Sequence, residues 1–151
     1  MAAVKRLSRV RGQRGAELVE FALTFPMLLL VLLGIIDFGF LFQRYEVLTN
    51  AAREGARVAV LPGYGAGDVV ARVNEYLATG GLTGATTTPL PATSVAIGGA
   101  CMTLAGVRVT YPHTFMFLGP IVGLMGGGGF TDKTLTVEAR MRYEGGALAC
   151  P

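Results

Sequence analysis

The sequence predicts an α+β protein in which one long N-terminal helix carries a small antiparallel β-sheet head. Residues 21–42 form a nearly continuous apolar run, and helical periodicity continues from there to residue 60. Residues 103–111 and 134–143 instead alternate between apolar and polar side chains, as strands do when one face covers a core. We therefore expect three segments: a basic leader at residues 1–15, a long helix at 16–61 and an α+β head at 62–151.

The first part of the chain has the features of a membrane signal. Residues 1–15 hold five Lys or Arg residues and no acid, and cations beside an apolar span are retained in the cytoplasm. A helix of about 20 apolar residues crosses a bilayer, whereas a secretory signal peptide has an apolar region of only about 7 to 15 residues. We expect one span, at about residues 21–42, with the amino end inside and residues 43–151 outside.

Charge outside the leader is slightly negative. The chain has 13 basic and 10 acidic residues, so removal of five basic residues with the leader leaves 8 against 10, a net charge of −2. The exported part lacks the clustered Lys/Arg stripe with aromatic residues that nucleic-acid binding requires. Nucleic acid is therefore not an expected partner, whereas the apolar span makes membrane lipid one.

Beyond the span, the helix carries a face of small residues. Leu48, Ala52, Gly55 and Ala59 recur at steps of three and four residues, which allows another backbone to approach closely. The sequence Leu61-Pro62-Gly63 predicts the end of the helix. Within the span, Pro26 either bends the helix for packing or is one of the prolines that membrane helices commonly contain.

The head is expected to combine a short helix with strands. We expect a helix at residues 68–78 with Asp68 as its N-cap, a loop at 82–91 and a short strand at 94–97. The two alternating segments should pair antiparallel and cover the outer half of the long helix. The apolar, glycine-rich segment 113–130 reads as a mobile connection that packs on the head, on a neighbouring subunit or at the membrane surface, the first being favoured.

Residues for catalysis are scarce. The single histidine, His113, provides one of the three or four ligands that a zinc site needs, and it is best interpreted as a loop or packing residue. The only serines are Ser8 and Ser94, which leaves no hydrolase triad. We expect no enzyme activity, metal or cofactor. Cys101 and Cys150 both lie in the exported part, where they form a disulfide or remain separate buried thiols.

Two acids in or beside the apolar run need an explanation, because a carboxylate in lipid is costly. Asp37 lies near the outer boundary and is interpreted as a solvated interfacial acid. A cut after Gly15 would place the new amine of Ala16 one helical turn before Glu20. That amine would pair with Glu20 of its own chain or of a neighbour; alternatively, Glu20 marks the inner boundary of an uncut signal anchor.

Three sequence motifs carry a family resemblance. They are Gly15-Ala16-Glu17-Leu18-Val19-Glu20-Phe21, then Gly34-Ile35-Ile36-Asp37-Phe38-Gly39, and Thr49-Asn50-Ala51-Ala52-Arg53-Glu54-Gly55-Ala56-Arg57. Together they resemble the TadE-like minor pilins, or pseudopilins, of tight-adherence (Tad/Flp) type IV pili. Phe21 replaces the tyrosine that is commonest at its position, but it keeps the aromatic ring.

The resemblance implies a pilin-like fold and a route of assembly. A prepilin peptidase of the bacterial inner membrane would cut between Gly15 and Ala16, and Glu20 with Phe21 would act in assembly. The partners implied are other pilin subunits and the Tad inner-membrane assembly platform, with the head finally on the pilus or cell surface. A head of about ninety residues favours a tip or priming subunit. The alternatives are an uncleaved signal-anchored envelope protein or adhesin, and the principal filament subunit.

Overall fold

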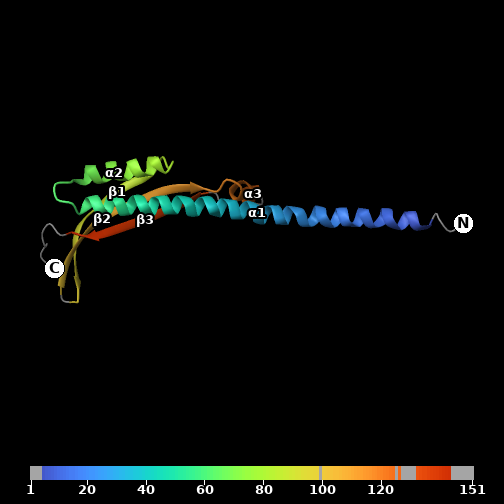
Figure 1. The fold of residues 1–151 in the computed structure, drawn as a ribbon, viewed down its shortest axis with the longest axis horizontal. Coiled ribbons are helices and arrows are strands. Elements are labelled where there is room, and N and C mark those ends of the chain that lie inside the picture. Colours follow the sequence, from blue (N-terminus) through green and yellow to red (C-terminus); the bar gives the residue numbers. More distant parts are fainter. Residues whose placement is uncertain (1–4, 99, 125, 127–131, 144–151) are drawn as a thin grey trace.

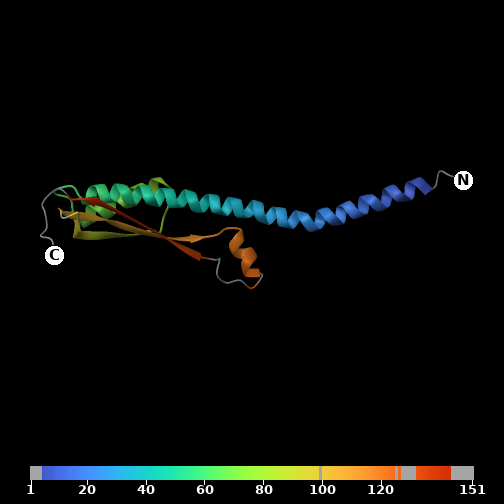
Figure 2. The same cartoon turned by 90° about the horizontal axis from the view of Figure 1, so that it is seen from below.

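One helix dominates the fold and projects far beyond the head. The computed structural model describes residues 5–98, 100–124, 126 and 132–143. Helix α1 runs from Lys5 to Ala59, and the rest of the chain packs beside its C-terminal part (Figure 1). The helix begins well upstream of Gly15, so most of the expected leader continues the same helix in the uncut chain. Pro26 lies inside α1, which bends in its blue N-terminal part (Figure 2).

The head is a three-stranded sheet with two further helices. Its strands pair antiparallel in the order β1-β2-β3, so β2 is central. The fold is therefore α+β, and the prediction of a long helix packed by a small antiparallel sheet is confirmed. The elements after α1 are α2 (Ala66–Thr79), β1 (Thr86–Ile97), β2 (Ala100–Thr114), α3 (Leu118–Leu124) and β3 (Asp132–Arg142).

The core lies where the C-terminal part of α1 meets α2 and one face of the sheet. Helix α2 contributes side chains four residues apart, and the strands contribute alternate side chains, as their periodicities require. Each fully buried Val or Leu contributes about 1.5–3 kcal/mol relative to an exposed one, so this contact holds the head on the helix. The central members are Leu48, Ala52, Val69, Val73, Leu77, Val107, Val109, Leu135 and Val137.

Helix α2 begins earlier than predicted, and its N-cap is a different residue. The cap is Gly65, whereas Asp68 lies in the first turn. The Asp68 carboxylate accepts a hydrogen bond from the Gly65 backbone N–H at 2.8 Å. The prediction of Asp68 as N-cap was therefore wrong by one turn, because an acid in the third helical position can serve the cap from inside the helix.

The expected loop at residues 82–91 is largely a strand. Strand β1 starts at Thr86 and includes Pro89 and Pro91, which suggested a loop from the sequence. Since β1 is an edge strand, a proline that cannot donate is tolerated there. The pairing with β2 shifts register between Leu90 and Thr93, beside the second proline.

The connection after β2 contains a helix and contacts α1. Strand β2 continues to Thr114, so His113 lies in a strand and not in a loop. Residues 118–124 then form α3, and Leu118 packs against Gly34 of α1. The prediction of a mobile connection that packs on the head was therefore not correct, because α3 lies beside the apolar part of α1. Residues 125 and 127–131 of the same connection lie outside the described residues.

Candidate functional site

The predicted processing segment lies far from the head. Residues Gly15 to Phe21 are exposed on α1, and a Cβ added at Gly15 would meet no atom within 4 Å. Phe21 stacks on Phe25 with ring centroids 5.2 Å apart, and the Thr24 hydroxyl donates to the Glu20 carbonyl at 3.0 Å. The structure brings these residues near no other element of the fold. Their roles in cleavage and assembly stay predictions.

The segment that follows is apolar and uncovered. Within the described residues, the part of α1 from Gly15 to Ala59 is the one helix long and apolar enough to cross a membrane, and the protein buries none of its most apolar window. Large side chains such as Leu23, Met27 and Ile35 are mostly exposed. A soluble protein rarely leaves such a surface open, so this surface suits lipid or other apolar helices.

The transition between the bare and covered parts of α1 occurs at Asp37. This carboxylate is only 2% exposed. Its oxygens accept three backbone N–H bonds, from Met116 at 3.1 Å, Phe117 at 2.9 Å and Leu118 at 2.7 Å. The interpretation of Asp37 as a solvated interfacial acid was therefore wrong. Three donors replace the water that a buried carboxylate would otherwise need, and they attach the start of α3 to α1.

A second polar contact lies two helical turns further along α1. Arg44 donates a hydrogen bond to Nδ1 of His113 at 2.9 Å. Its guanidinium also stacks over the Tyr111 ring, 5.8 Å from the centroid. The His113 ring packs edge-on against Phe115, which contacts Phe38 in the same manner. Asp37 and Arg44 thus join the apolar helix to the C-terminal end of β2 and the start of α3.

His113 is held in its neutral form. Burial lowers its pKa, and the Arg44 cation lowers it further, while Asp37 acts in the opposite direction. Because Nδ1 accepts the bond from Arg44, the proton of the neutral ring belongs on Nε2. In the described part of the protein Nε2 has no partner. A cavity of about 60 Å³ lies beside Asp37, Arg44 and His113, large enough for a water molecule.

The face of small residues packs against the protein's own head. Leu48 and Ala52 are fully buried in the core, Gly55 is buried and Ala59 partly so. A Cβ at Gly55 would overlap the Val73 side chain and stand 3.0 Å from Val107. Close approach was expected at this face, and the partners are α2 and β2 of the same chain.

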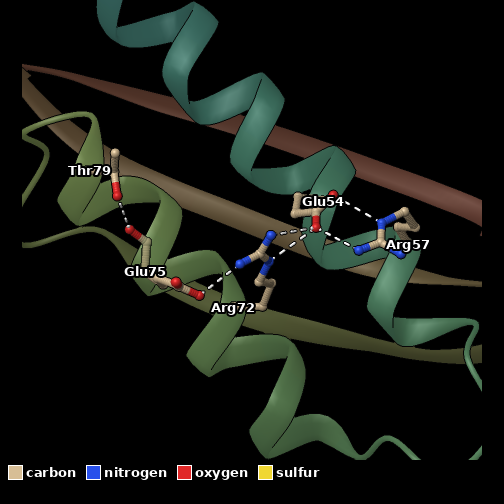
Figure 3. A network of polar contacts seen from close by, with 5 residues as sticks. All are labelled: Glu54, Arg57, Arg72, Glu75 and Thr79. Carbon is tan, nitrogen blue, oxygen red and sulfur yellow. Dashed lines mark hydrogen bonds and ion pairs between the residues drawn. The ribbon is translucent and has the colours of Figure 1, made fainter.

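An exposed ionic network ties α1 to α2 at the far end of the head (Figure 3). Glu54 pairs with Arg57 at 2.8 Å and with Arg72 at 3.0 Å, and Arg72 also pairs with Glu75 at 2.9 Å. Hydrogen bonds from Arg57 and then Arg72 outweigh desolvation and lower the Glu54 pKa to about 2. The network links the exposed sides of the two helices, above the buried contacts that hold them together.

A metal site is not assembled in the described part of the chain. Residues 5–98, 100–124, 126 and 132–143 contain no group of three His, Cys, Asp or Glu side chains that could hold a metal ion. Cys101 lies at the start of β2, but Cys150 lies outside the described residues, so their pairing stays a prediction. The contacts of Asp37 and Arg44 were missed from the sequence, although their seven-residue spacing places both on the face that leads to Leu48.

Comparison with known proteins finds a similarity over most of α1. The family described as TadE-like protein matches residues 15–57. No curated protein and no solved structure matches the chain. The matched residues begin at the predicted cleavage point and end two residues before the end of α1, so they contain the apolar part, Asp37, Arg44 and the small-residue face. The resemblance inferred from the motifs is thereby confirmed for residues 15–57, which match the TadE-like family.

Proposed function

We propose that the chain is a minor pilin, or pseudopilin, of a Tad/Flp type IV pilus, cut after Gly15 and assembled through α1. The observation that carries the proposal is the division of one helix into a bare apolar part and a part that holds the head. A helix of this kind loses little when it moves from lipid into a bundle of apolar helices, because both surroundings are apolar. We infer a single span in the inner membrane, with the amino end in the cytoplasm and the head outside.

Exposure of the motif supports processing and assembly. Gly15 and Ala16 lie on an exposed stretch of α1, far from the head, where a membrane peptidase could reach them. Glu20 is also exposed, and the described side chains offer its carboxylate no partner. After a cut at Gly15, the Ala16 amine would lie one turn away and neutralise it, in the same chain or in a neighbour. Pro26 would shape how the helix packs in the assembly, whereas the small-residue face is already occupied by the head of the same chain.

The size of the head supports a tip or priming position. The sheet and α2 pack along the C-terminal part of α1 and broaden that end of the molecule (Figure 1). A repeating shaft subunit must pack tightly against copies of itself on all sides, and a broad head obstructs that packing. The partners proposed are therefore the prepilin peptidase, other pilin subunits and the Tad inner-membrane assembly platform.

Processing can be tested by the intact mass of the chain, expressed with and without prepilin peptidase. The native chain should lose residues 1–15 only when the peptidase is present. Gly15→Leu should stay uncut, because a peptidase site that takes a small residue excludes a branched one. The matched control is Gly67→Leu, at an exposed glycine of α2 with no atom within 4 Å of an added Cβ. An unshifted mass of the native chain would support the uncleaved anchor or adhesin instead.

Assembly can be tested in the same cells, by measuring how much of the chain is present in filaments sheared from their surface. Glu20→Ala should be exported and cut but absent from filaments, while Glu17→Ala, an exposed acid one turn earlier on α1, should be retained. Quantitative mass spectrometry should find the native chain at trace level. Abundant copies along the filament would instead identify the principal subunit.

A further inference from the structure

We propose that α3 and the two residues before it lie in the outer leaflet of the membrane, as a second lipid contact beside the span of α1. The inference rests on the proposed membrane anchor and extends it, since a single-span pilin needs no part of its head in lipid. The occupant of this surface is the hydrocarbon and headgroup boundary of the bilayer. The matching surface of the protein is the exposed side of Met116 to Leu124.

The composition of this segment suits lipid. From Thr114 to Phe130 the sequence has no Asp, Glu, Lys or Arg. Met116 is 61% exposed. Leu124 is 92% exposed, which is more than any other large apolar side chain in the described part of the chain. Ile121 and Val122 are half-buried between them. Such a surface is costly in water and favourable in the apolar layer of a membrane.

Contacts with α1 fix the level of the segment. Leu118 packs against Gly34, with methyl carbons 3.9 Å from an added Cβ. Asp37 binds the backbone N–H groups of three consecutive residues at the start of α3. Gly34 and Asp37 both lie within the apolar run, before its last residue, Phe42. If α1 crosses the membrane, α3 must therefore stand beside the outer end of the span and not above it.

Two cations mark the outer boundary of the apolar surface. The first cation on α1 after the apolar run is Arg44, seven residues beyond Asp37, or about 10 Å at the standard helical rise. Lys133 of β3 is exposed and pairs in the sheet with His113, the residue that binds Arg44. Two cations at one level suit the phosphates of lipid headgroups. Helix α3 lies on the apolar side of that level, at the depth where interfacial helices bind.

The orientation of α3 agrees with an interfacial position. Figure 2 shows α3 leading away from α1 across its axis, so that α3 would lie roughly in the membrane plane when α1 crosses it. In Figure 1, no other described element of the head extends further toward the amino end. The Asp37 carboxylate and the three N–H groups that it binds satisfy one another, which removes the main polar cost of placing this junction in lipid.

The absence of tryptophan from the chain provides a direct test. Single tryptophans are introduced as Leu124→Trp, Met116→Trp, Ile35→Trp and Tyr64→Trp, and each full-length protein is reconstituted in phosphatidylcholine vesicles with or without brominated acyl chains. Bromine quenches tryptophan only on contact in the bilayer. Ile35 is 65% exposed in the span, and Tyr64 is 57% exposed at the far end of the head, so they are the positive and negative controls.

We expect quenching at Leu124→Trp and Met116→Trp close to that at Ile35→Trp and well above that at Tyr64→Trp. If Ile35→Trp is not quenched, the membrane anchor itself is refuted. A second outcome is that Ile35→Trp is quenched, while Leu124→Trp and Met116→Trp are quenched no more than Tyr64→Trp. This outcome overturns the α3 inference and leaves the anchor intact. Quenching at α3 that disappears at high protein density, while Ile35→Trp stays quenched, assigns the surface to a neighbouring subunit. Two α3 reporters are used so that a single misfolded variant does not decide the outcome. Circular dichroism identifies a variant that misfolds.

Discussion

The two parts of α1, before and after Asp37, belong to one continuous helix but have different surroundings. From Gly15 to Ile36 the apolar side chains are almost all exposed, whereas Leu48, Ala51, Ala52 and Ala56 are completely buried. The exposed part has the larger side chains and the buried part the smaller ones. Apolarity alone therefore does not predict burial here. Small side chains permit a close crossing of α2 and β2, and large ones suit a fluid or helical environment that adapts to them.

The extent of the family match agrees with this division. It includes both parts of α1 and stops at residue 57, before α2 and the sheet begin. The shared feature of TadE-like proteins in this chain is thus the helix together with its docking face. The head, residues 62–151, lies outside the matched segment.

Glycines in the two parts of α1 offer the strongest test of the contrast. Gly55→Leu should destabilise the head by about 3 kcal/mol, because the side chain would overlap Val73 and press on Val107 in a filled core. Gly15→Leu is the control in the bare part, since an added Cβ there also meets nothing within 4 Å. Thermal unfolding of the full chain in lipid nanodiscs measures both. Equal losses would mean that the bare part is packed against something in the isolated protein.

A substitution at Asp37, where the two parts of α1 meet, should have a local effect on the start of α3. Asp37→Ala leaves three N–H groups without their acceptor, at a cost of about 1–3 kcal/mol for a buried unsatisfied group. Amide exchange at Met116, Phe117 and Leu118 should then accelerate by roughly 10- to 100-fold. The internal control is exchange at Val107 and Val109 in the middle of β2, which should not change. Unchanged exchange at residues 116–118 would show that α3 keeps its place without Asp37.

Periodicity explains how much of this structure the sequence predicts. The long helix, the pairing of the two alternating strands and the burial of Val107, Val109, Leu135 and Val137 all follow from repeats within a single segment. Strand β1 was missed because its prolines predict a loop, although its threonines favour a strand. Prolines are tolerated in β1 only because it lies at the edge of the sheet, which a local sequence pattern does not reveal.

The junction was missed for a different reason. Asp37 and its donors are 79 to 81 residues apart, and Arg44 and His113 are 69 apart. No local pattern encodes such a contact. One signal was available: Asp37, Leu41, Arg44 and Leu48 recur at steps of four and three, and this stripe continues into the small-residue face. A polar residue on a buried stripe is expected to have a partner within the fold.

The smallest expected effect concerns the ionic network at the far end of the head. Glu54 has its pKa lowered to about 2, so its stabilisation is complete above pH 4.5 and is lost as the pH falls toward 2. Since Arg57 and Arg72 are about half exposed, Glu54→Gln should cost only about 0.5–1 kcal/mol. Glu46→Gln, at an exposed acid of the same helix, is the control. Thermal unfolding of both variants across pH 2–7 measures the effect.

The pH profile separates Glu54 from His113. The lowered pKa of His113 means that its contribution is complete above about pH 6.5 and declines as the pH falls below that value. Glu54→Gln should therefore remove only the loss below pH 4.5 and keep the earlier decline. If Glu54→Gln also removed the earlier decline, the network at α2 and the junction at Asp37 would be coupled along α1. The two parts of the helix would then not be the independent regions that their packing indicates.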